Sequence, residues 1–200
     1  MNKYNLLKIS LLCGLISAIL ISMVGFSEVC SEMQQNIIRI RILANSDSNE
    51  DQALKLQVRD AILSESGKLF EDSETYEDAV AIAEEELDKF LSVAQNTVLK
   101  CGYEYEVSLD FRDEYFDTRH YDSFTLPAGE YKTAVFTIGA GKGENWWCVI
   151  FPRVCIGACS DGIDKTLSDK AVKTAQEPEK YVYRFKSLEI LEKIKNIFKF

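Results

Sequence analysis

The clearest pattern in the chain is the alternation of apolar and polar residues in three short stretches. Residues 36–43 place isoleucines on one face and Arg39, Arg41 and Leu43 on the other. Residues 103–111 and 131–138 alternate in the same way. A period of two residues is typical of half-exposed strands, so the sequence predicts three strands. The two arginines of the first strand face either solvent or a surface for binding and ion pairing.

A glycine-rich turn, residues 139–144, separates the third strand from an almost wholly apolar run, Asn145 to Phe151. Two β-type runs joined by a short turn that contains glycine predict an antiparallel hairpin, Tyr131 to Phe151. The lack of alternation in the second run indicates a strand with both faces covered. The turn is not a phosphate-binding loop, because a strand rather than a helix follows it.

Two stretches have helical periodicity, about 49–64 and 73–100. Ser48 followed by Asp51 resembles a capping arrangement at the start of the first helix, and Gly102 ends the second. Residues 112–125 are polar and aromatic and predict a long loop with one short strand. The predicted fold class is α+β: an N-terminal strand, two helices, and an antiparallel sheet that ends in the hairpin.

Both ends of the chain differ from this central domain, residues 36–159. Residues 1–27 carry Lys3 and Lys8 and then an uncharged apolar run, the layout of a secretory signal. Cleavage after Ser27 and retention as a membrane anchor are both open, and either places the rest of the chain outside the cytoplasm. Residues 28–35 and 160–180 are interpreted as polar linkers.

The tail, residues 181–200, predicts a basic amphipathic helix. Such a helix can pack on its own domain, or it can dock on a membrane surface or a partner.

Charge and cysteine spacing exclude several function classes. The formal net charge of −9 argues against nucleic acid as a partner, because phosphate binding needs a basic face. A single histidine and the absence of paired cysteine motifs exclude the common zinc sites. We therefore predict no metal, no cofactor and no catalytic residue.

Cys148 is the residue with the most alternatives. In an exported protein it can form a disulfide with Cys155 if the chain bends at Pro152, and Cys159 and Cys101 are other partners. Buried free thiols are a further alternative. A Cys148–His120 pair could instead serve a hydrolase, although cysteine nucleophiles usually lie at a helix start rather than inside a strand.

Two blocks of the chain resemble the stage II sporulation protein R family, and together they span roughly residues 36 to 156. The upstream block comprises Ile38 to Asp47, Asp51, Gln52, Leu54, Lys55 and Val58 to Asp60. The downstream block comprises Pro127 to Gly129, Tyr131, Gly139, Gly141, Gly143, Asn145 to Val149, Phe151, Pro152 and Cys155. The Asn-Trp-Trp-Cys run is specific, because Trp and Cys are scarce.

The resemblance implies a signalling protein of spore-forming Firmicutes, exported into the space between forespore and mother cell. There such proteins activate a membrane-embedded aspartic protease that processes the pro-form of sigma-E. A secreted Cys–His hydrolase and an envelope or spore structural protein are the alternatives. Trp146 and Trp147 should point to opposite faces of their strand, and an outward Trp is a natural interface anchor. The candidate partner-binding residues are Arg39, Arg41, Asn45, Asp47, Asn145, Trp146 and Trp147.

Overall fold

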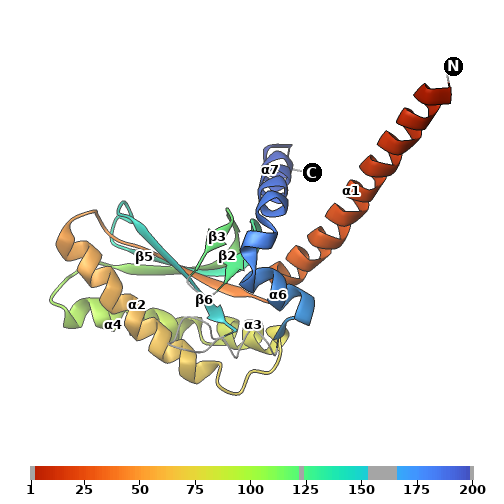
Figure 1. Cartoon of the computed structure of the whole chain (residues 1–200). Coiled ribbons are helices and arrows are strands. Elements are labelled where there is room, and N and C mark those ends of the chain that lie inside the picture. Colours follow the sequence, from red (N-terminus) through yellow and green to blue (C-terminus); the bar gives the residue numbers. More distant parts are fainter. Residues whose placement is uncertain (1–2, 122–123, 153–165, 199–200) are drawn as a thin grey trace.

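The computed structural model describes residues 3–121, 124–152 and 166–198 (Figure 1). They form a mixed α+β fold with helices against both faces of a four-stranded sheet, which confirms the predicted fold class. The helices are α1 (Lys3–Gln35), α2 (Asn49–Leu69), α3 (Tyr76–Glu85), α4 (Leu87–Lys100), α6 (Asp169–Gln176), the 3-10 turn Pro178–Lys180, and α7 (Val182–Phe198). The strands are β1 (Ile38–Leu43), β2 (Val107–Phe116), β3 (Arg119–His120), β4 (Thr125–Leu126), β5 (Gly129–Ile138) and β6 (Asn145–Phe151).

The strand order in the large sheet is β2-β5-β1-β6. β1 is parallel to β5, with Ile40 opposite Ala134, and antiparallel to β6, with Arg41 opposite Trp147. The prediction that the two runs flanking the glycine turn pair as a hairpin is therefore wrong. Both runs are strands, but β1 lies between them and takes the hydrogen bonds of both. The connection 139–144 crosses the end of β1 instead of closing a hairpin.

One face of the sheet packs against α2, α3 and α4, which lie below it in Figure 1. The three alternating isoleucines of β1 point into this core, as the period of two predicts. The other buried side chains from the sheet are Val107, Ala134, Phe136, Ile138, Cys148, Ile150 and Phe151. The helices contribute Leu54, Val58, Ile62, Phe90, Ala94 and Val98 at helical spacing.

The opposite face of the sheet is covered at one end by the last turns of α1 and by α6. Residues 28–35, interpreted as a linker, belong to α1, and their Val29 and Met33 are buried. α6 lies within residues 160–180, interpreted as the second linker, and buries Ala171 and Ala175. These two helices pack on side chains from β2, β4, β5 and β6, namely Phe116, Leu126, Tyr131 and Val149.

Several boundaries differ from those predicted. α2 begins at the predicted Ser48 cap, whose hydroxyl accepts from the Asp51 amide at 3.2 Å, but it extends to Leu69. The predicted helix 73–100 is interrupted at Glu86 and forms α3 and α4. β2 continues to Phe116, inside the predicted loop 112–125, and the short pair β3–β4 follows.

The two ends of the described chain project on the same side of the sheet (Figure 1). The first part of α1 exposes large apolar side chains from Tyr4 to Val24, whereas α1 is buried from Phe26 onward at Phe26, Val29, Cys30 and Met33. In the part of the chain that the structure describes, no helix has both the length and the apolarity that crossing a membrane requires. The predicted C-terminal helix is α7.

Candidate functional site

Two loops interlock at the end of the sheet where β1 leaves it. The amides of Lys142 and Gly143 donate to the carbonyls of Asn45 and Ala44 at 3.2 and 2.9 Å. The side chain of Asn45 accepts from the amide of Ala140 at 2.9 Å. The carboxylate of Asp47 accepts from the amide of Glu144 at 2.6 Å. Asn45 and Asp47, both candidate partner-binding residues, therefore hold the glycine-rich loop in place.

The glycines of this loop permit a close approach of two backbones. A Cβ atom on Gly143 would lie 2.2 Å from the carbonyl oxygen of Ser46, far inside van der Waals contact. A Cβ atom on Gly139, whose φ is +56°, would lie 2.5 Å from the Asn45 side-chain oxygen. The glycine pattern thus serves the contact between the two loops.

Asp51 is the buried carboxylate beneath the interlocked loops. Its side chain accepts hydrogen bonds from Asn45 at 2.8 Å and from Ser46 at 2.5 Å. Burial acts to raise the pKa of Asp51, but the hydrogen bonds donated by Ser46 and Asn45 outweigh it and hold the pKa below its ordinary value. The charge also lies in the first turn of α2, where the helix dipole favours an anion.

We expect Asp51→Asn to lower the free energy of unfolding by about 1–2 kcal/mol at pH 7. The folded-state pKa lies below the unfolded value, so the ionised carboxylate stabilises the fold above about pH 4. That contribution is lost as the pH falls through the folded-state pKa, so the difference between the two proteins should shrink at acidic pH. Urea unfolding across this range measures the difference, and Glu71→Gln in an exposed loop is the control. A pH-independent difference would contradict the assignment.

Arg41 bridges the two edge strands of the sheet. Its Nε donates to the side-chain oxygen of Asn145 on β6 at 3.0 Å, and its Nη1 forms an ion pair with Glu114 on β2. Both charged side chains are partly exposed. Arg41 and Asn145, predicted separately, therefore form one polar unit on the face opposite α2 and α4.

Arg39 lies inside the protein and not on a surface. Its side chain is fully buried, with the guanidinium 3.7 Å from the centre of the Phe116 ring and 5.0 Å from that of Tyr131. One Nη donates to the hydroxyl of Tyr121 at 2.8 Å. The Nε and the other Nη find no hydrogen-bond partner among the described residues. Burial lowers the pKa of Arg39. An exposed binding role for this residue is wrong, because the helices α1 and α6 cover its half of the face.

Trp146 and Trp147 point to opposite faces of the sheet, as expected for neighbours on a strand. Trp146 packs against the core between the sheet and α2, with the Arg59 guanidinium 5.4 Å from its ring centre. Trp147 packs beside the opposite core, with Arg119 at 4.1 Å. Both rings are half-buried. The exposed part of each ring is therefore available to a partner while the buried part keeps its packing.

The structure does not assemble the Cys148–His120 pair. Cys148 is disulfide-bonded and packs in the core under α2 and α4, so it has no free thiolate to act as a nucleophile. The His120 ring nitrogen Nδ1 lies 2.9 Å from the Thr125 hydroxyl within the β3–β4 pair, which packs at the other face. Cys13, Cys30 and Cys101 are free. The pairing of Cys148 with Cys155 stays a prediction, because Cys155, like Cys159, lies outside the described residues.

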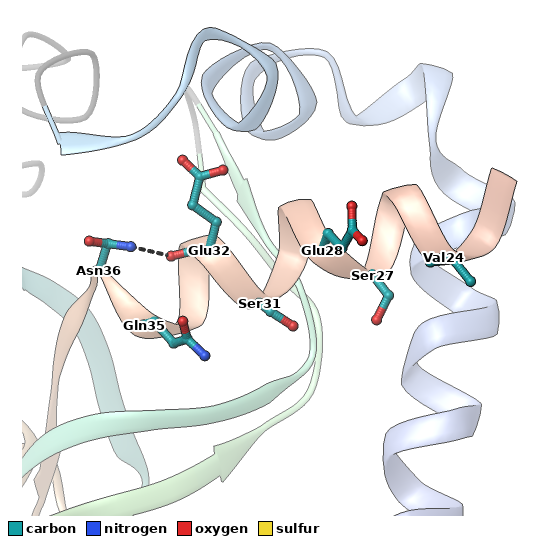
Figure 2. Close-up of a pocket in the computed structure, with 7 residues that line it drawn as sticks. All are labelled: Val24, Ser27, Glu28, Ser31, Glu32, Gln35 and Asn36. Atoms are coloured by element: carbon teal, nitrogen blue, oxygen red, sulfur yellow. Dashed lines mark hydrogen bonds between the residues drawn. The ribbon is translucent and has the colours of Figure 1, made fainter. Parts of the chain in front are cut away.

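A surface depression follows the last turns of α1 (Figure 2). The side chain of Asn36 donates to the Glu32 carbonyl at 2.8 Å, as the dashed line marks. The carboxylate of Glu32 accepts from the amide and the hydroxyl of Ser168 at 2.6 and 2.8 Å, at the start of α6. The Glu32 carboxylate therefore links α1 to the start of α6. The lining residues are Val24, Ser27, Glu28, Ser31, Glu32, Gln35 and Asn36.

A comparison with protein families matches residues 34–161 to stage II sporulation protein R. The chain belongs to this family. Stage II sporulation protein R of Bacillus subtilis (strain 168) is 39% identical over 142 residues, which cover 71% of this chain and 60% of that protein. The match thus spans less than two thirds of the relative's length. No solved structure matches the chain. The resemblance found in the sequence is confirmed, and the matched range contains all seven candidate partner-binding residues.

Proposed function

We propose that this sporulation protein is an exported signal that activates a membrane-embedded aspartic protease, which processes the pro-form of sigma-E in the mother cell. The observation that carries the proposal is the family match over residues 34–161. The charged start and uncharged apolar run of residues 1–27 support export. The protein would act in the space between forespore and mother cell.

The side chains best placed to meet the protease lie on and beside β6. This strand is at the edge of the large sheet in the described chain, and it carries Trp146, Trp147 and Asn145. A half-buried Trp beside an arginine, as in Trp147 with Arg119, combines the two residue types that dominate binding energy in interfaces. The Arg41–Asn145 unit lies next to it and would supply directional polar contacts.

Activation requires that the protein bind the active state of the protease more tightly than the inactive state. To shift such an equilibrium from about 1:99 to about 99:1, the affinities must differ by about 10⁴-fold. A ligand without chemistry of its own can achieve this when the protease has two arrangements of similar energy. Arg39 would contribute indirectly, by holding Tyr121, Phe116 and Tyr131 around it.

Reconstitution tests the proposal directly. The chain is co-expressed with the protease and the sigma-factor precursor in a non-sporulating host, and precursor cleavage is followed by immunoblot. We expect cleavage only when this protein is present, and undiminished cleavage with His120→Ala. Trp147→Ala should weaken activation by about 30-fold, the loss typical of an interface anchor. Tyr183→Ala, an aromatic residue 89% exposed on α7, is the matched control.

Two results would overturn the proposal. No precursor cleavage, with the protein shown to be exported and folded, would remove the activating role. Loss of cleavage with His120→Ala in a folded protein would return the hydrolase alternative. Equal activity of Trp147→Ala and Tyr183→Ala would move the recognition surface away from β6 and leave the activating role in place.

A further inference from the structure

α7 is held against α1 by a small aromatic cluster that is separate from the two cores of the sheet. Its buried members are Phe26 and Cys30 of α1 and Phe185 and Leu188 of α7. The Phe26 ring stacks on Tyr181 at 5.8 Å and meets Phe185 edge-on at 5.2 Å between ring centres. Phe26 is only 3% exposed. It is the central side chain of the contact.

A cation completes the surroundings of Phe26. The Arg184 guanidinium lies 5.9 Å from the centre of the Phe26 ring and 5.7 Å from that of Tyr181. Such a site favours an aromatic side chain, because ring faces attract cations and ring edges meet ring faces favourably. An aliphatic side chain in the same place would keep the apolar contact but lose both of these interactions.

The ion pair that links α7 to the sheet is weak. Lys193 contacts Asp117 at 3.0 Å, but both side chains are about half exposed, and exposed ion pairs contribute little. The buried contacts that α7 makes with α1 are those with Phe26 and Cys30.

The predicted signal cleavage, after Ser27, falls inside this contact. It would remove Phe26 and leave Cys30. The remaining turns of α1 stay attached by other contacts: Met33 is fully buried, and the Gln34 side chain donates to the Ala128 carbonyl at 2.9 Å. Cleavage would thus leave the domain intact and take away one side of the cluster around α7.

We propose that Tyr181, Phe185 and Leu188 form a docking surface. In the uncut chain Phe26 fills this surface. After signal cleavage it binds an apolar helix of the membrane partner through an aromatic side chain of that helix. The inference rests on the proposed export and activation. A partner helix that takes the place of the removed segment should resemble that segment. Residues 9–26 of α1 carry no charge, and Phe26 supplies the aromatic ring. Docking through the apolar face of an amphipathic helix is a recurring mode of recognition.

Cys30 reports whether α7 is docked. It is a free thiol, 1% exposed. Burial, with a smaller contribution from Glu192 on α7, raises its pKa to about 12. The thiol should therefore react slowly with iodoacetamide while α7 covers it, because the thiolate is the reactive form. Undocking of α7 would expose it.

The first experiment measures iodoacetamide alkylation of Cys30 by peptide mass spectrometry in the full chain, before and after treatment with signal peptidase in membrane vesicles. We expect alkylation about tenfold faster or more after cleavage, and also in the uncut Phe26→Ala variant. Ile21→Ala, at a position 73% exposed on the same helix, is the matched control and should stay slow. A synthetic peptide of residues 15–27 should restore protection to the cut chain, and the same peptide with Phe26→Ala should not.

Slow alkylation after cleavage, a chain that signal peptidase leaves intact, or equal protection by both peptides would overturn the proposal. In the reconstituted system, Phe185→Ala should reduce precursor cleavage by about tenfold or more, whereas Tyr183→Ala should not. If Phe185→Ala activates as well as the unchanged protein, the docking surface is refuted while the activating function stands. If the unchanged protein gives no cleavage, the function fails whatever Cys30 shows.

Discussion

Replacing Gly143 by alanine should lower the free energy of unfolding by roughly 3 kcal/mol, among the larger effects of a single substitution. The new Cβ atom would lie 2.2 Å from the Ser46 carbonyl oxygen and 3.0 Å from the Ala44 Cβ atom. The obstacle is backbone on one side, so no flexible side chain can give way. Moving the loops apart would also break the hydrogen bond from the Gly143 amide to Ala44. Urea unfolding at neutral pH measures the loss.

Gly102→Ala separates this steric clash from backbone strain. Gly102 has a φ of +84° with nothing within 4 Å of an added Cβ. Its replacement should cost only about 1–2 kcal/mol, the penalty for a left-handed backbone. A Gly143→Ala variant no less stable than Gly102→Ala would show that the two loops are not in close contact.

Arg39→Met should raise the free energy of unfolding by about 1–2 kcal/mol. The guanidinium is fully buried, uses one hydrogen bond and leaves two nitrogens unpaired among the described residues. A charge taken out of water with so few partners is costly. Methionine keeps most of the contact with Phe116 and Tyr131 and carries no charge. Thermal and urea unfolding of the unchanged protein and of Arg39→Met show whether the substitution raises or lowers the free energy of unfolding.

Arg39→Ala is the informative comparison. It also removes the charge but leaves a cavity between two rings, so it should be less stable than Arg39→Met by about 2 kcal/mol or more. If Arg39→Met instead destabilises as much as Arg39→Ala, the charge has partners in the native protein that stabilise it. Measuring precursor cleavage with a stable Arg39→Met protein then tells whether the charge itself serves the protease.

Alternation in the sequence predicted which side chains of β1 and β5 share a face, but not which strands pair. The isoleucines of β1 and the residues Ala134 and Phe136 of β5 all point into the core between the sheet and α2, as predicted. A period of two residues carries this information because the backbone sets it locally. Pairing depends on residues about 90 positions apart, such as Ile40 and Ala134, and no local pattern records it.

Polar composition was misleading at both ends of the domain. Val29 and Met33, four residues apart, are the only signal that residues 28–35 pack on the sheet, and polar neighbours surround them. In α6 the buried residues are the small Ala171, Thr174 and Ala175, which a hydrophobic pattern hardly marks. These two helices also explain Arg39: its alternating strand predicted an exposed face, and α1 and α6 cover that face.

Among the candidate residues, the tryptophans were easiest to place. Alternation along a strand is local, and Trp146 and Trp147 lie on opposite faces of the sheet as expected. Asn45 and Asp47 instead accept from amides 95 and 97 positions away in the glycine-rich loop, and no local pattern records those partners. The link between Arg41 and Asn145 joins residues 104 positions apart, and it depends on the strand order that sequence alone did not supply.

The central position of β1 in the sheet affects how the protein folds during synthesis. β1 is the first strand to be synthesised, yet both of its neighbours, β5 and β6, come near the end of the domain. Such distant pairings slow folding, because a long loop must close before any contact forms. Until residues 145–151 have been synthesised, the edge of β1 that pairs with β6 has no partner and is open to aggregation. A chain truncated before β6 should therefore not form a smaller version of the fold, and the complete sheet becomes available only after nearly all of the domain has been synthesised.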